Sequence, residues 1–81
     1  MNIKVGSLYQ NIANLEEPIY NKKDEMVGFD TEHEVGLNDI VMILEYETEI
    51  YDEETVYKAR ILYKNIVGWI WFYSDYFKEI K

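Results

Sequence analysis

Residues 57–80 read YKARILYKNIVGWIWFYSDYFKEI, and this stretch decides the fold that the sequence predicts. Segments 55–63 and 67–73 are rich in β-branched and aromatic residues, which favour strands. The pair Lys64-Asn65 between them predicts a tight hairpin turn, because Asn tolerates the left-handed backbone of such turns. A turn of 3₁₀ helix is expected from Ser74 to Phe77, followed by a last short strand.

Working outward, the clearest other strand is predicted at residues 40–50. Strict alternation puts five residues on one face and five on the other. The first set is Met42, Leu44, Tyr46, Thr48 and Ile50, and the second is Val41, Ile43, Glu45, Glu47 and Glu49. Shorter strands are expected at 3–9, 18–21 and 26–29, with a turn at 21–25 and a loop at 30–38. Five to six short strands with turns between them predict one all-β domain over residues 1–81.

Composition narrows the class of protein. The chain has 81 residues, 8 Tyr, 3 Phe, 2 Trp and no Cys, so a thin core is reinforced by aromatic rings and by no disulfide. The missing cysteine favours a reducing compartment, and we expect a cytoplasmic protein. The longest uninterrupted apolar run, at 40–44, is far too short to cross a bilayer, so no membrane partner is expected.

Negative charge is concentrated in the middle of the chain. Residues 24–57 hold twelve carboxylates and no Lys or Arg, whereas the rest holds four acids and eight bases; −12 and +4 give the net charge of −8. Such a field repels nucleic acid, which we do not expect to bind directly, and it favours a basic partner. The alternative is a solvated face that keeps a small β protein soluble.

Several segments resemble the SH3-like fold, especially bacterial SH3 domains and small phage proteins of that fold. They are Ala59-Arg60-Ile61-Leu62-Tyr63, Lys64-Asn65, Gly68-Trp69-Ile70, Ser74-Asp75-Tyr76-Phe77, Val5-Gly6-Ser7-Leu8-Tyr9 and Asn38-Asp39-Ile40-Val41. The resemblance implies a small SH3-like barrel that binds rather than catalyses. It also implies that residues 24–34 and 45–54 lie on the same side of a groove. No proline follows Gly68, so a ligand rich in proline is not implied.

We therefore predict a partner-binding surface of acidic loops and aromatic anchors. Its residues are Asp30, Glu32, Glu34, Glu45, Glu47, Glu49, Asp52, Glu53, Glu54, Trp69, Trp71 and Tyr76. Trp69 and Trp71 share one face of a strand, and that face is either exposed to a partner or covered by a loop. No catalytic, cofactor or metal site is predicted, because the motifs that such sites require are missing.

Three functions fit these features. The leading hypothesis is a non-enzymatic module that binds a basic protein surface or peptide. The runner-up is an acidic inhibitor, of the kind encoded by phages, that mimics nucleic acid and blocks a host nuclease or defence complex in the bacterial cytoplasm. The carboxylates of Glu45, Glu47 and Glu49 repeat at about 6.6–6.8 Å, comparable to single-strand phosphates. The third is a structural subunit of a larger assembly, with homo-oligomers also possible.

Overall fold

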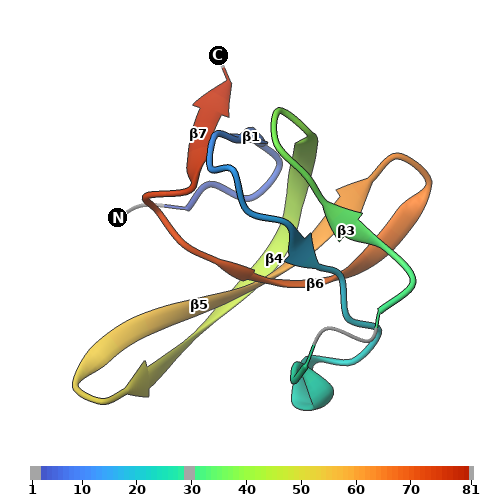
Figure 1. Ribbon diagram of the computed structural model, residues 1–81. Coiled ribbons are helices and arrows are strands. Elements are labelled where there is room, and N and C mark those ends of the chain that lie inside the picture. Colours follow the sequence, from blue (N-terminus) through green and yellow to red (C-terminus); the bar gives the residue numbers. More distant parts are fainter. Residues whose placement is uncertain (1–2, 29–30, 81) are drawn as a thin grey trace.

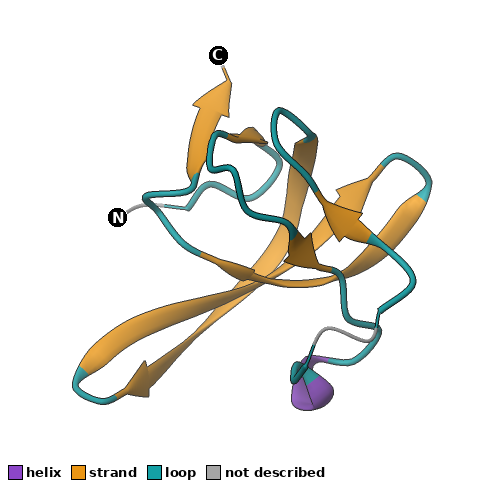
Figure 2. Ribbon diagram, in the orientation of Figure 1, coloured by secondary structure: helices purple, strands orange, loops and turns teal. Residues whose placement is uncertain are grey.

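The computed structural model describes residues 3–28 and 31–80, which are mostly strand with one short helix (Figure 2). The elements are β1 (Leu8–Asn11), β2 (Glu17–Pro18), η1 (Lys23–Glu25), β3 (Glu34–Val35), β4 (Ile40–Tyr51), β5 (Glu54–Tyr63), β6 (Ile66–Phe72) and β7 (Phe77–Ile80). Five strands form an antiparallel sheet in the order β6-β5-β4-β1-β7, and β2 pairs with β3. The predicted all-β class is therefore correct.

The long β4–β5 hairpin dominates the shape of the molecule. Figure 1 shows that its far end extends beyond the rest of the fold. The hairpin is longer than its neighbouring strand β6, which ends at Phe72 opposite Tyr57. The part of the hairpin between Tyr57 and the turn therefore has no third strand beside it. Its turn residues Asp52 and Glu53 both have positive φ (49° and 68°), as a tight two-residue hairpin turn requires.

The short strands before β4 differ from the prediction. The first strand begins at Leu8 rather than residue 3, because Gly6 has φ 86° and the chain turns there. The strand expected at 26–29 does not form at 26–28, where Gly28 has φ 78°; Phe29 lies outside the described residues. The loop expected at 30–38 contains the short strand β3.

The 3₁₀ helix also lies elsewhere. Residues 74–76 form a turn in which Tyr76 N donates to the Tyr73 carbonyl at 3.0 Å. The 3₁₀ helix of the described chain is η1, where a turn had been expected.

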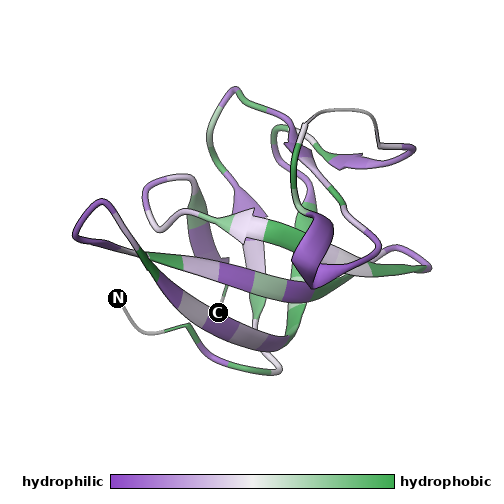
Figure 3. Ribbon diagram, turned by 90° about the horizontal axis from the view of Figure 1, so that it is seen from below, coloured by the Kyte–Doolittle hydropathy of each residue, from purple (hydrophilic) through white to green (hydrophobic). Residues whose placement is uncertain are grey.

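The core lies on one face of the curved sheet. Ile43, Ala59, Ile61, Ile70 and Phe72 fill it from β4, β5 and β6 and are almost wholly buried. The ring of Phe72 stacks on Phe77 at 4.7 Å between centroids and meets the edge of Tyr9 at 5.2 Å. In Figure 3 the hydropathy alternates along the strands, and the far end of the β4–β5 hairpin is hydrophilic.

A close backbone approach attaches β2 and the residues after it to β6. Tyr20 and Trp69 exchange two backbone hydrogen bonds of 2.8 Å each. Gly68 makes this approach possible, because a Cβ there would collide with the Ile19 side chain and lie 3.0 Å from the Tyr20 carbonyl oxygen. The strand pairing of the described residues does not close into a ring, so what is established is a curved five-stranded sheet with a second, two-stranded one.

Candidate functional site

A β-bulge in β4 decides where the acidic ladder points. Ile43 pairs with Ile61 but Glu45 pairs with Arg60, so Leu44 is the extra residue. The predicted alternation is therefore wrong beyond Ile43, because a bulge moves every later side chain to the opposite face. Glu45, Glu47 and Glu49 therefore lie on the face of Arg60 and Lys58 and not on that of Ile43. On the neighbouring strand β6, Arg60 pairs with Trp69 and Lys58 pairs with Trp71.

Each carboxylate of the ladder has a cation from this chain. Glu45 pairs with Arg60 at 2.8 Å, Glu47 with Lys23 at 3.0 Å and Glu49 with Lys58 at 2.8 Å. The ladder is thus compensated in charge, whereas phosphate mimicry requires uncompensated negative charge along a surface.

The two tryptophans are half-buried beneath η1 and its neighbours. The indole N–H of Trp71 donates to the Met26 carbonyl at 3.1 Å. Lys23 lies over the ring of Trp69 at 5.8 Å, and Lys58 lies over that of Trp71 at 5.1 Å. The face of the two tryptophans was expected to be either exposed to a partner or covered by a loop. The structure shows partial coverage by a loop.

The acids at the hairpin turn stand apart from this compensated face. Asp52, Glu53 and Glu54 are exposed, and no ion pair involves them among the described residues. Asp52 and Glu54 line a shallow cavity of about 310 Å³, together with Tyr51, Val56, Trp71 and Tyr73. This hairpin cavity places two carboxylates beside three aromatic side chains.

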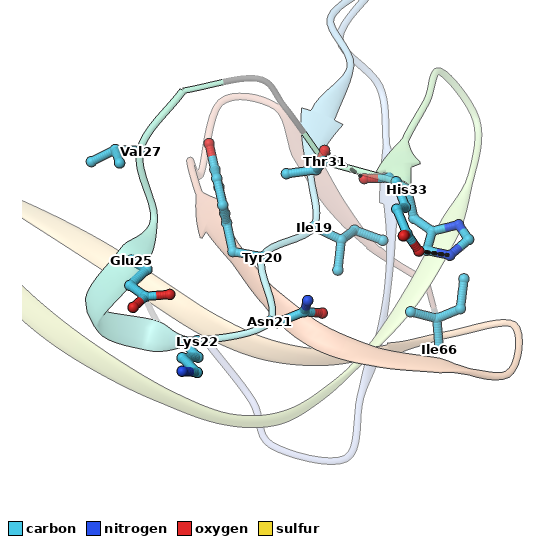
Figure 4. Close-up of a pocket in the computed structure, with 10 residues that line it drawn as sticks. Ile19, Tyr20, Asn21, Lys22, Glu25, Val27, Thr31, His33 and Ile66 are labelled. Carbon is cyan, nitrogen blue, oxygen red and sulfur yellow. Dashed lines mark hydrogen bonds and ion pairs between the residues drawn. The ribbon is translucent and has the colours of Figure 1, made fainter.

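In the other acidic stretch, residues 24–34, the loop around Glu32 lies at the opposite end of β5 from the hairpin turn. Glu32 and His33 line a polar cavity of about 320 Å³ with Ile66, which pairs with Tyr63 at the end of β5 far from Glu54 (Figure 4). Lys22 and Glu25 line the same cavity, so it has no single sign of charge. The two acidic stretches therefore meet only in part: η1, at the start of residues 24–34, lies against the ladder through the Lys23–Glu47 ion pair, whereas Glu32 and the hairpin turn lie at opposite ends of β5. Asp30 lies outside the described residues.

A third cavity contains a carboxylate that sequence reasoning missed. It has a volume of about 400 Å³ and lies on the other side of Trp71 and Tyr73, which line both this cavity and the hairpin cavity. Its remaining lining residues are Leu15, Glu16, Glu17, Pro18, Tyr20, Met26 and Gly28. Glu17 is only 8% exposed, and no hydrogen bond or ion pair of its carboxylate is found among the described residues. We call this the Glu17 cavity.

Burial disfavours the charge of Glu17. Desolvation raises the pKa of its carboxyl from 4.5 to about 7. Desolvation also raises the pKa values of the Tyr20 and Tyr73 hydroxyls, and the nearby Glu17 carboxylate raises both by a smaller amount. At the rim, a side-chain hydrogen bond with Glu16 raises the pKa of Glu34. Three carboxyl groups therefore lie in or beside this cavity.

Local hydrogen bonds fix the segment that carries Glu17. The buried side-chain amide of Asn11 donates to the carbonyls of Leu15 at 2.9 Å and Val35 at 3.2 Å, and its oxygen accepts from Ala13 N at 2.9 Å. Glu17 then pairs with Val35 in the β2–β3 ladder. Asn11 thus holds the loop between β1 and β2 in place.

Tyr76, the last predicted anchor, is half-buried against the core. Its ring lies 5.3 Å from that of Tyr73 at an interplanar angle of 56°. It lines a small cavity of about 180 Å³ with Glu54, Tyr57 and Asp75, and neither tryptophan lines that cavity.

Comparisons with protein-family models, with curated proteins and with solved structures find no match for this chain. No helix among residues 3–28 and 31–80 is long and apolar enough to cross a membrane.

Proposed function

We propose that this protein is a non-enzymatic module that binds a basic protein surface or peptide, with an SH3-like barrel as its scaffold. The observation that carries the proposal is the hairpin cavity, which is lined by the acidic residues Asp52 and Glu54 together with the aromatic residues Tyr51, Trp71 and Tyr73. Carboxylates and aromatic faces are the two kinds of group that attract ammonium and guanidinium ions.

The distribution of charge supports the same choice. The ladder Glu45-Glu47-Glu49 is neutralised by Arg60, Lys23 and Lys58 within the fold. The acids without an ion pair among the described residues include those of the hairpin turn and those at the edge formed by Glu16, Glu17 and Glu34. A projecting acidic hairpin is accessible to a partner and steers basic molecules toward it.

A pair of charge-neutralising variants tests the proposal. Glu54→Gln removes one charge from the hairpin cavity, and Glu32→Gln removes one from the exposed loop at the other end of β5. We expect Glu54→Gln to weaken binding of a lysine-rich peptide by about threefold to tenfold, as loss of one partly exposed ion pair implies, and Glu32→Gln by less than about twofold. Tryptophan fluorescence measures both, because Trp71 lines the cavity.

Equal weakening by the two variants would show that only net charge matters. A peptide with glutamine in place of every lysine is the negative control. If the wild-type protein binds neither peptide, or binds both equally, the proposal is overturned.

A further inference from the structure

The Glu17 cavity has the features of a site for one particular chemical group. Glu17, a residue that is only 8% exposed, lines a cavity of about 400 Å³, and none of the other lining residues is basic. Buried carboxylates are ordinarily paired with a cation or hydrogen-bonded, because an isolated buried charge is costly. The described residues supply no such partner to Glu17, so a ligand can supply it.

The rest of the lining defines the shape of that ligand. Leu15, Pro18 and Met26 offer an apolar wall, whereas Tyr20, Trp71 and Tyr73 offer aromatic rings. An alkyl chain fits the first group, and a cationic head fits the second together with the carboxylate. The matching ligand is an alkylammonium ion.

We propose that the Glu17 cavity binds a single alkylammonium group, the side chain of a lysine in the basic partner. The proposal deepens the function given above and depends on it for the source of the lysine. Trp71 and Tyr73 line both cavities, so one basic segment that crosses them reaches Asp52 and Glu54 on one side and Glu17 on the other.

Binding of a cation here has a proton linkage. A carboxyl with a pKa of about 7 is partly protonated at neutral pH, and an ammonium ion favours its charged form. Ligand binding therefore releases a proton near pH 7, and affinity rises as pH increases through that value. The other titratable groups at the cavity are Glu16, Tyr20 and Tyr73, with Glu34 beside Glu16.

The test uses n-butylammonium as the probe and the whole chain at about pH 8, where Glu17 is mostly ionised. Amide and indole NMR shifts are followed during the titration. We expect shifts confined to residues 15–20, 26–28 and 71–73, no response to the uncharged n-butanol, and affinity at least about tenfold lower in Glu17→Gln. Glu32→Gln, with the same charge change at an exposed residue that does not line the cavity, should bind like wild type within about twofold.

Several results would overturn the inference: equal binding to Glu17→Gln, shifts elsewhere, or no response to the amine. Failure of the Glu17 site and failure of the proposed function give different results. If the lysine-rich peptide binds and is weakened by Glu54→Gln while the amine does not bind, only the Glu17 site is lost. If the amine binds but no basic peptide does, the site recognises free amines, and both the lysine assignment and the proposed function fail.

Discussion

Glu17 couples the stability of this protein to pH in an unusual direction. Its pKa is about 7 in the folded chain against an ordinary value of 4.5. Below 4.5 both states are protonated and the group contributes nothing. Between 4.5 and 7 the unfolded chain loses the proton first, so the free energy of unfolding falls as pH rises. Above 7 the loss is complete and amounts to about 3 kcal/mol at most.

Glu17→Gln is expected to remove this dependence. The variant should match the wild type at about pH 4, where Glu17 is mostly protonated in both states, and be more stable at about pH 8, because Gln is neutral at both values. Urea unfolding at the two pH values measures the difference. An identical pH dependence in wild type and variant would show that Glu17 is not desolvated in the folded protein.

Gly68 is the second residue with a sharp expected effect. A Cβ at this position meets the Ile19 side chain and the Tyr20 backbone, so Gly68→Ala must displace the segment that docks on β6. We expect a loss of about 1–3 kcal/mol in unfolding free energy, as overpacking implies. Val67→Ala on the same strand, where the side chain is half exposed, is the control and should cost less than about 1 kcal/mol. Equal effects of the two substitutions would contradict this packing.

At the residue scale, the sequence predicts the structure where the backbone conformation restricts which residue types fit. Asn38 stands where the resembled family has Gly, and it has φ 70°, in the left-handed region that both residues tolerate. Glu17 gave no comparable signal. Its burial depends on pairing with Val35 and on the rings of Trp71 and Tyr73, which come from distant parts of the chain.

At the element scale the bulge in β4 is what hydrophobic alternation missed. The residues 43–45, Ile-Leu-Glu, carry no Gly or Pro that would mark an irregularity. The extra residue is detected only from the register, in which Glu45 rather than Leu44 opposes Arg60. By contrast, β5 and β6 were predictable, because β-branched and aromatic residues dominate both strands.

Because of the bulge, Lys58 and Arg60 both form ion pairs with the acidic ladder, but the two side chains differ in burial. Lys58 is 8% exposed and also donates to the Lys23 carbonyl at 3.1 Å, whereas the side chain of Arg60 is 41% exposed. We expect Lys58→Ala to cost about 1–3 kcal/mol, because the buried ammonium loses its ion pair with the half-exposed Glu49 and the Lys23 carbonyl loses a hydrogen bond. Arg60→Ala should cost less than about 1 kcal/mol. Thermal unfolding of both variants tests this order, and a reversed order would contradict it.

At the scale of the whole molecule, charge is divided into a compensated face and free acidic ends. The sequence showed the excess of carboxylates in residues 24–57 but not how the fold distributes them. Bases from outside that stretch, Lys23, Lys58 and Arg60, neutralise the ladder because the topology brings them to it. The acids of the hairpin turn and of the Glu17 cavity have no ion pair among the described residues.

The salt dependence of peptide binding tests the central claim most directly. The affinity of the wild-type protein for a lysine-rich peptide is measured by fluorescence from low salt to about 1 M, where the Debye length falls to about 3 Å. Recognition through acidic cavities predicts that affinity falls steadily as salt is added. An affinity that stays constant across the series would contradict the claim that carboxylates select the partner.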